Sequence, residues 1–386
     1  MRTWLIALGA TLLSSAACAA PDCDLRAPDA RAAGPGCARA WMDANLRLND
    51  ILTVGTHNSY KTRIPEAEFA RLRAVAGDEV KGLEYGHPPL TEQLDDGARQ
   101  LELDVYYDPQ GGRYAAPLGP RLLGGVPPEG YAGAMARPGF KVMHMQDVDF
   151  RSRCATFVAC LGEIRAWSKA HPDHAPILIM MNAKDGPSSV PGGTAALPFD
   201  TRAFDALDAE IAQAFAPNEM VTPDQVRGAR AALREAVAAD GWPTLGAARG
   251  KVLFALDEGP AKTDAYRGGR RTLEGRLVFV NADPSAADAA YATLNDPVAD
   301  AAAIRAAVLA GMVVRTRADA DTVEARAGDG RRRDAALASG AQYVSTDYRR
   351  PDPAFGPYQA RLPGGATVVC NPVRRPERCA GLPVEP

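Results

Sequence analysis

Short apolar runs recur along the chain and alternate with segments that have the spacing of amphipathic helices. Several of these runs are rich in Val, Ile, Leu and Phe, which is typical of strands covered on both faces. Eight candidate strands result: residues 51–56, 100–106, 140–144, 176–182, 251–256, 277–281, 311–315 and 342–346. Strands that alternate with helices in this number predict an α/β protein with a TIM-like, closed (β/α)₈ barrel.

The segments between the strands carry helical signals. Phe204, Leu207, Ile211 and Phe215 recur at steps of three and four residues, which predicts one buried helix face. Further helices are expected over residues 156–169, 222–239 and 299–309. An open, doubly wound sheet is the alternative fold, but no glycine-rich phosphate-binding turn follows an early strand.

Residues 110–139 interrupt this alternation between the second and third candidate strands. They hold 8 Gly and 5 Pro in 30 positions, so we expect no regular element there. In a barrel, an insertion after the second strand lies near the C-terminal mouth, where active sites form. The segment is therefore either a substrate-binding loop or a surface insertion.

The first 19 residues predict a secretory signal peptide. Arg2 supplies the positive charge, residues 4–17 are apolar or small, and Ala17-Cys18-Ala19 fits a small-x-small cleavage site. Acylation of Cys18 is the alternative, but Ser15 stands where lipoproteins usually have a bulky aliphatic residue. We expect an exported protein, periplasmic or secreted, whose residues 20–386 form one barrel domain with its core at about 50–350.

Six cysteines remain after this cleavage, and an even number in an exported protein favours disulfides. Pairing between sequence neighbours is the simplest of the fifteen connectivities that six cysteines allow. These pairs are Cys23–Cys37, Cys154–Cys160 and Cys370–Cys379.

The charge balance limits the classes of partner. The chain has 44 Lys and Arg against 47 Asp and Glu, a formal net charge of −3. It therefore lacks the basic excess that would neutralise a phosphate backbone, and nucleic-acid binding is not expected. No long basic cluster is present to anchor the chain electrostatically on a membrane, and no stable protein partner is implied.

Two carboxylates share one face of the second candidate strand. In the run Leu101-Glu102-Leu103-Asp104-Val105, the period of two turns the apolar side chains toward the helices and both acids toward the barrel interior. Two desolvated carboxylates repel each other, and a divalent cation that prefers oxygen ligands, such as Ca²⁺ or Mg²⁺, would relieve that repulsion. The alternative is an exposed strand end with solvated acids.

Two histidines end other candidate strands at the same mouth. His57 follows the first strand, in Thr56-His57-Asn58-Ser59-Tyr60, and His144 ends the third. Together with Glu102 and Asp104 they form a converging set suited to proton transfer. Three other histidines stand in loop-like sequence and are expected at the surface: His87, His171 and His174.

At these residues the sequence resembles the bacterial calcium-dependent phosphatidylinositol-specific phospholipase C-like proteins, relatives of the catalytic barrel of eukaryotic phosphoinositide phospholipases C. The matching stretches follow the order and spacing of that family and span nearly the whole chain after the signal. They are residues 56–60, 94–105, 142–144 and 341–348.

The resemblance implies a phosphodiesterase of the phospholipase C type, which cleaves phosphoinositide to diacylglycerol and (cyclic) inositol phosphate by internal attack. His57 and His144 match the two catalytic histidines of the family. Lys184 follows the fourth strand and is a candidate to contact the substrate phosphate. Arg315 is a weaker phosphate candidate, with a salt bridge to a nearby acid as the alternative.

The resemblance also implies a cation site. Asn58, Glu102 and Asp104 match calcium ligands of the family, with Mg²⁺ a less favoured occupant than Ca²⁺. The family often has a further acidic ligand at the end of the fourth strand, where this chain has Asn182. An amide can still offer an oxygen, but the site loses one negative charge.

Three other functions stay open at this point. A glycerophosphodiester phosphodiesterase uses a related barrel on soluble diesters, and the lack of an obvious apolar patch for docking on a bilayer favours it. A catalytically idle barrel that binds a sugar phosphate or a surface partner is kept open by Asn182. A glycosidase ranks last, because Glu102 and Asp104 lie two apart on one strand and cannot flank a scissile bond well. The implied partner is a phospholipid or glycerophosphodiester substrate, with peripheral membrane contact for the former.

Overall fold

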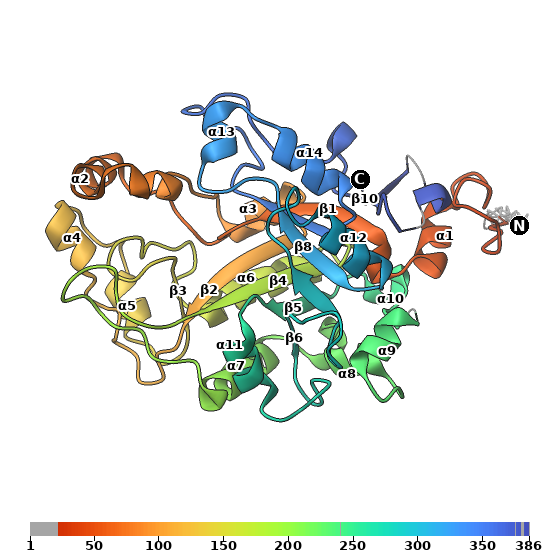
Figure 1. Ribbon diagram of the computed structural model, residues 1–386, viewed down its shortest axis with the longest axis horizontal. Helices are drawn as coiled ribbons and strands as arrows, with labels where there is room; N and C mark the ends of the chain where they lie inside the picture. The colour runs from red at the N-terminus through yellow and green to blue at the C-terminus, as the bar shows by residue number, and fades with distance from the viewer. Residues whose placement is uncertain (1–21, 240, 375, 380–381, 386) are drawn as a thin grey trace, which may run out of the picture.

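The computed structural model describes residues 22–385, apart from residues 240, 375, 380 and 381. The expected signal peptide and Cys18 lie outside the described residues. The described part of the chain is an α/β structure built on two mixed β-sheets, with helices on either side of the strands (Figure 1).

The first sheet has the strand order β11-β10-β1-β9-β8-β7. Its strands are β1 (Ile51–Thr56), β7 (Tyr291–Thr293), β8 (Val313–Arg317), β9 (Tyr343–Thr346), β10 (Val368–Cys370) and β11 (Pro383–Glu385). The second sheet has the order β3-β2-β4-β5-β6. Its strands are β2 (Gln100–Tyr106), β3 (Lys141–Val142), β4 (Ile177–Lys184), β5 (Val252–Leu256) and β6 (Val278–Val280).

Parallel pairing dominates both sheets. β1, β9, β8 and β7 are parallel neighbours, as are β2, β4, β5 and β6, whereas β10 and β3 join antiparallel. The two sheets also lie against each other, β1 beside β2 and β6 beside β7. Gly55 permits the first of these approaches, because a Cβ there would collide with the backbone oxygen of Gln100. Closure of the strands into one hydrogen-bonded barrel stays a prediction.

Fourteen α-helices occur in the described residues. The first seven are α1 (Ala38–Asn45), α2 (Glu66–Ala76), α3 (Leu90–Asp95), α4 (Leu118–Leu123), α5 (Tyr131–Met135), α6 (Phe157–Ala170) and α7 (Thr201–Ala214). The others are α8 (Pro223–Arg227), α9 (Leu233–Ala238), α10 (Leu245–Ala248), α11 (Pro260–Arg267), α12 (Ala301–Leu309), α13 (Val323–Ala327) and α14 (Arg331–Ala338). In Figure 1, α2, α4 and α5 gather at the end of the molecule toward which β2 points, and α1 lies at the opposite end.

The alternation predicted for β2 is confirmed. Leu101, Leu103 and Val105 are fully buried in the main apolar core, together with helical residues such as Leu94 and Ile164. Burial of these side chains on one face turns Glu102 and Asp104 to the other face of the strand. The predicted face of α7 is also buried, since Phe204, Leu207 and Ile211 belong to the same core.

The strand predictions need two corrections. The third candidate strand is only Lys141–Val142 and runs antiparallel to β2, so it is an edge strand and not a parallel barrel strand. Its apolar run reflects packing of Phe140 against Phe157 and Phe199. The sequence analysis missed three strands of three residues each: β7, which pairs with β8, and β10 and β11, which pair with each other beside β1.

Two expectations about helices also need correction. Residues 110–139 contain the short helices α4 and α5 despite their Gly and Pro. The single helix expected over residues 222–239 is two helices, because Gly228 adopts a positive φ of 55° and ends α8.

The three expected disulfides are present: Cys23–Cys37, Cys154–Cys160 and Cys370–Cys379. They close loops near α1, before α6 and beyond β10. Among the described helices, none has both the length and the apolar character needed to cross a membrane.

Candidate active site

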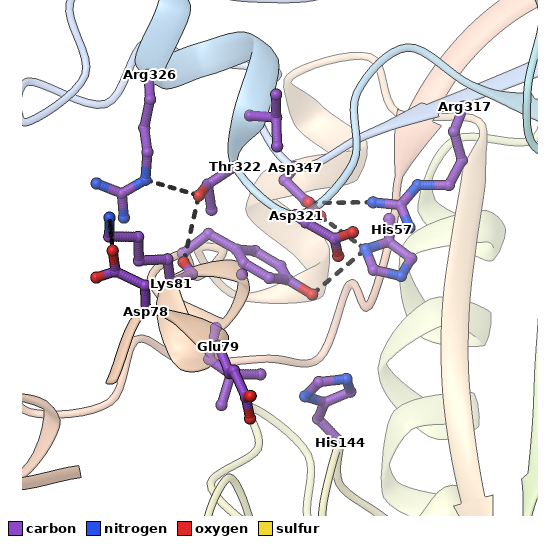
Figure 2. Close-up of a pocket in the computed structure, with 14 residues that line it drawn as sticks. His57, Asp78, Glu79, Lys81, His144, Arg317, Asp321, Thr322, Arg326 and Asp347 are labelled. Carbon is purple, nitrogen blue, oxygen red and sulfur yellow. Dashed lines mark hydrogen bonds and ion pairs between the residues drawn. The ribbon is translucent and has the colours of Figure 1, made fainter. Parts of the chain in front are cut away.

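A polar cavity of about 420 Å³ opens beyond the carboxyl ends of the strands, and both predicted catalytic histidines line it (Figure 2). His57 comes directly after β1, and His144 is the second residue after β3. The other walls come from the 3₁₀ segment η2 (Gly77–Leu83), Arg317 at the end of β8, Asp347 after β9, and α13. The cavity therefore joins residues from both sheets.

His57 is positioned by groups that are distant in the sequence. Its Nδ1 lies 2.8 Å from Asp347 Oδ1, and its backbone N–H donates to the Thr346 carbonyl at the end of β9. The Tyr85 hydroxyl lies 3.3 Å from the same Nδ1. His87 and His174 are both buried rather than at the surface as expected, and His87 Nε2 lies 2.8 Å from the His57 carbonyl oxygen. These contacts leave His57 Nε2 as the nitrogen available to a reacting group.

Burial lowers the pKa of His57 well below its ordinary value of 6.5, and the cationic Arg317 and Arg315 lower it further. The imidazole is thus neutral at pH 7. With its Nδ1–H donated to Asp347, the neutral ring carries a free lone pair on Nε2. A ring in this state can accept a proton from a substrate hydroxyl.

His144 belongs to a second imidazole–carboxylate pair. Its Nδ1 lies 2.9 Å from Asp149 Oδ2, and the buried ammonium of Lys61 lies 3.2 Å from the same oxygen. Lys61 also donates to the backbone carbonyls of Leu83 and Tyr85, each at 2.8 Å. Burial alone would raise the pKa of Asp149, but Lys61 and the His144 hydrogen bond outweigh burial and lower it. Asp149 therefore stays charged beside His144.

The two predicted inward carboxylates meet the amide of Asn182. Asp104 and Asn182 are direct cross-strand neighbours on β2 and β4, so their side chains share one face of the sheet. Asn182 Nδ2 donates to Glu102 Oε1 at 2.9 Å and to Asp104 Oδ1 at 3.1 Å. Both acids are nearly inaccessible, at 3% and 1% exposure, and Glu102 Oε1 lies 3.7 Å from His57 Nε2. The acid pair thus lies behind His57, away from solvent.

The two phosphate candidates both pair with these carboxylates. Arg315, only 1% exposed, donates from Nη2 to Glu102 Oε2 at 2.6 Å, which is the salt bridge that the sequence left as its alternative. Lys184 Nζ lies 3.0 Å from Asp104 Oδ2, and this carboxylate raises the pKa of Lys184. The Lys184 side chain keeps 35% exposure, so it can still reach an anion, whereas Arg315 is enclosed.

Burial raises the pKa of Glu102 to about 7, although Arg315 favours its charged form. The neighbouring Asp104 adds to the rise through like-charge repulsion. A carboxyl with these neighbours is sensitive to any cation that approaches it. Its protonation state is therefore coupled to occupancy of the site.

The side chains around Asn182 have the chemistry of a hard-cation site. Asp104 Oδ2 is buried and accepts no hydrogen bond from the described residues, although Lys184 Nζ is near. Asn58 has a positive φ of 45°, and the Tyr60 hydroxyl donates a hydrogen bond to its amide oxygen at 3.1 Å. No three Asp, Glu, His or Cys side chains of the described residues gather closely enough to bind a metal by themselves. A cation at this position would therefore need the amide oxygens of Asn58 and Asn182 besides the two carboxylates, and such oxygen ligands fit Ca²⁺.

Sequence reasoning missed Arg317, Asp347, Asp149 and Tyr85. Arg317 carried a signal, since it lies two residues after Arg315 on one strand and must share its face. Asp347 stands at the end of the last strand, inside a stretch that carried the family resemblance. Asp149 and Tyr85 lie in loops, and no periodicity pointed to them.

Comparison with known proteins identifies the family of this chain. The family model "Phosphoinositide phospholipase C, Ca2+-dependent" matches residues 46–372, which is most of the chain. The chain belongs to this family. Among curated proteins, no sequence matches significantly.

Solved structures of bacterial enzymes share the fold of this phospholipase C family member. A calcium-dependent phosphoinositol-specific phospholipase C from Pseudomonas sp. is 18% identical with a TM-score of 0.52, and the match covers 84% of this chain and 96% of that one. A calcium-dependent phosphatidylinositol-specific phospholipase C from Streptomyces antibioticus is 20% identical with a TM-score of 0.50, covering 85% and 99%. Family membership makes the chain an enzyme of the phosphodiesterase class, in agreement with the sequence resemblance.

Proposed function

We propose that this protein is an exported, calcium-dependent phospholipase C that cleaves phosphatidylinositol to diacylglycerol and a cyclic inositol phosphate. The observation that carries the proposal is the pair of imidazoles in one cavity, each held through Nδ1 by a buried carboxylate. Family membership supplies the reaction class. Residues 20–386 would act as one barrel-type catalytic unit.

The two histidines take different roles in this reaction. The neutral His57 accepts, at Nε2, the proton of the inositol hydroxyl beside the phosphate as that hydroxyl attacks phosphorus. His144 gives its Nε2 proton to the glycerol oxygen as the phosphorus–oxygen bond breaks, and the charged Asp149 stabilises the imidazolium before transfer. One bond to phosphorus forms and one breaks, and one proton is taken up and one is released.

Basic side chains of the protein would position the substrate phosphate. Arg317 lines the cavity and donates to Asp347 Oδ2 at 3.2 Å, which leaves further guanidinium N–H groups for a phosphate oxygen. Lys184 is a second candidate contact, since its side chain keeps 35% exposure beside Asp104.

We propose Asn58, Glu102, Asp104 and Asn182 as the residues that would hold calcium. Bound calcium supplies positive charge that lowers the pKa of the attacking hydroxyl and offsets charge on the phosphoryl group. Because Lys184 and Arg315 already neutralise the two carboxylates, and Asn182 replaces an acid, we expect weak calcium binding.

The test measures turnover by the purified mature protein on phosphatidylinositol vesicles and on glycerophosphoinositol, with calcium and with chelator. The proposal expects release of diacylglycerol that stops with chelator and returns with calcium. Cleavage of the soluble diester alone would make the protein a glycerophosphodiesterase, and turnover of neither would favour the binding-protein alternative.

A matched variant tests the calcium ligands. Asn182→Glu adds the missing negative charge, so we expect half-maximal activity at a calcium concentration about tenfold lower. Full activity of the wild type in chelator would refute the calcium part of the proposal while leaving the histidine roles standing.

A further inference from the structure

An apolar groove of about 630 Å³ lies next to the catalytic cavity, a size within the range of small-molecule sites. Its walls come from four segments of the chain: the consecutive α2 and η2, then α4, and the loops of residues 145–148 and 189–191. Representative lining residues are Leu72, Val80, Leu122, Leu123, Val148 and Val190. The sequence analysis found no such patch, because its members come from four segments that only the fold brings together.

The groove adjoins the catalytic cavity. Glu79 and Leu83 of η2 line both, so one thin wall separates the two spaces. In Figure 2, Glu79 and His144 lie at the lower edge of the cavity, on the side away from Thr322 and Asp347. The groove also includes Met145, which directly follows His144, and Val148, which directly precedes Asp149. It therefore begins at the second imidazole–carboxylate pair and not at His57.

Large apolar side chains around this groove remain open to solvent. Val75 is 85% exposed, Leu122 56% and Val126 77%. The helices that line the groove also carry two arginines, Arg71 on α2 and Arg121 on α4. In the part of the chain that the structure describes, neither has a carboxylate within ion-pair distance, and Arg71 donates to the Leu123 carbonyl at 2.5 Å. Apolar side chains beside unpaired cations are suited to an amphiphile whose head group is anionic.

We propose that the groove binds an acyl chain of the substrate's own leaving group, and this inference rests on the proposed function. In that function His144 protonates the glycerol oxygen, so the diacylglycerol part of the lipid starts beside His144. The groove reaches this position through Met145, the neighbour of His144, and Val148, the neighbour of Asp149. A soluble diester without acyl chains would leave the groove empty, so the groove selects lipid over deacylated substrates.

The size of the effect follows from burial of methylenes. Each methylene that leaves water on entering the groove raises kcat/KM by up to about fourfold. We therefore expect, for phosphatidylinositols kept below the concentration at which they aggregate, a rise in kcat/KM from dibutyryl to dioctanoyl chains. Docking on a bilayer surface alone would give no such rise with monomeric substrates.

Two exposed positions allow the groove to be altered by substitution without disturbing the packing of the core. We expect Val75→Glu and Leu122→Glu to lower the ratio of dioctanoyl-phosphatidylinositol to glycerophosphoinositol turnover at least tenfold. Leu309→Glu is the matched control, because Leu309 is 58% exposed and ends α12, before the amino end of β8. The control should keep the wild-type ratio.

The outcomes separate this inference from the proposed function. A wild type without chain-length dependence, or groove variants that keep the wild-type ratio, would overturn the acyl site while phospholipase activity stands. If the wild type cleaves no substrate, the proposed function fails, and calorimetric binding of dioctanoyl-phosphatidylinositol still tests the groove. Binding that is equally strong in Leu122→Glu would then overturn the inference, and binding that is weakened there and kept in Leu309→Glu would support it.

Discussion

Two imidazole–carboxylate pairs face one cavity, and their carboxylates lie in different electrostatic environments. His57–Asp347 and His144–Asp149 have nearly the same Nδ1–oxygen distance, 2.8 and 2.9 Å, and the two rings are similarly exposed, at 17% and 20%. The exposure and geometry of the rings therefore do not distinguish them. The difference lies in what surrounds each carboxylate.

Asp347 lies beside another buried acid, and Asp149 lies beside a buried cation. Burial raises the pKa of Asp347 against the influence of Arg317, and it raises the pKa of the adjacent Asp319 to about 7, with Asp347 adding to the rise. Lys61 instead helps to keep the pKa of Asp149 low. The pair that contains Asp149 is suited to hold an imidazolium, and the pair that contains Asp347 is suited to hold a neutral base. In the proposed mechanism, pairs of similar geometry would therefore carry out opposite proton transfers.

The largest expected effect is on turnover. His57→Ala and His144→Ala should each lower kcat/KM by about 10²–10⁴-fold, the usual contribution of one acid or base. Both side chains are partly exposed, so circular dichroism and the Tm should stay close to wild type. Near-wild-type turnover by either variant would refute the assignment of that histidine.

The pH profile of the remaining activity sharpens the same test. Loss of the base should remove the acid limb of kcat/KM, and loss of the acid should remove the alkaline limb. The same limb lost in both variants would mean that the two pairs do not divide the roles.

The sequence alone was enough to predict the site residues that follow a local pattern. The period of two along β2 turned Glu102 and Asp104 inward, and strand ends pointed to both histidines. Sequence could not reach Asp347, because it meets His57 across 290 positions of the chain. The roles of Lys184 and Arg315 also depended on such distant partners, which only the packing of β2, β4 and β8 supplies.

The dependence on contacts between distant parts of the chain also explains the errors in the fold prediction. An apolar run marks burial and not strand direction, so residues 140–144 could not be distinguished from a barrel strand. β7 has three residues, which is too short for an alternating pattern to be recognised. The sequence did not reveal the apolar groove because Leu72, Leu122 and Val190 belong to segments that are far apart in the sequence until folding brings them together.

The next prediction compares the free energy of unfolding of variants in the two pairs. Asp149→Asn leaves the buried Lys61 ammonium without its carboxylate, so the free energy of unfolding should fall by about 3–5 kcal/mol. Asp347→Asn should cost only about 1 kcal/mol, since burial already disfavours the charge on Asp347 and Arg317 keeps partial solvent access. Urea unfolding at pH 7 measures both values. Equal losses would show that the carboxylates are held alike.

The last prediction concerns the pH dependence of stability, which should have opposite signs in the two regions. The raised pKa of Asp319 means that the folded state holds a proton that the unfolded state has lost, so stability falls by up to about 1.4 kcal/mol per unit as the pH rises from about 4 to 7. Asp149 behaves in the opposite way, because its pKa is lowered from 3.8. Its charged form stabilises the fold above that pH, and this contribution disappears as the pH falls below it.

Asp319→Asn should flatten the loss of stability between pH 4 and 7, since an amide oxygen can still accept the Asp347 N–H. Unfolding curves at four pH values in this range provide the measurement, with Asp149→Asn as the control that keeps the wild-type slope there. A wild-type slope in Asp319→Asn would mean that the region around His57 carries no extra proton, and the contrast between the two pairs would then rest on Lys61 alone.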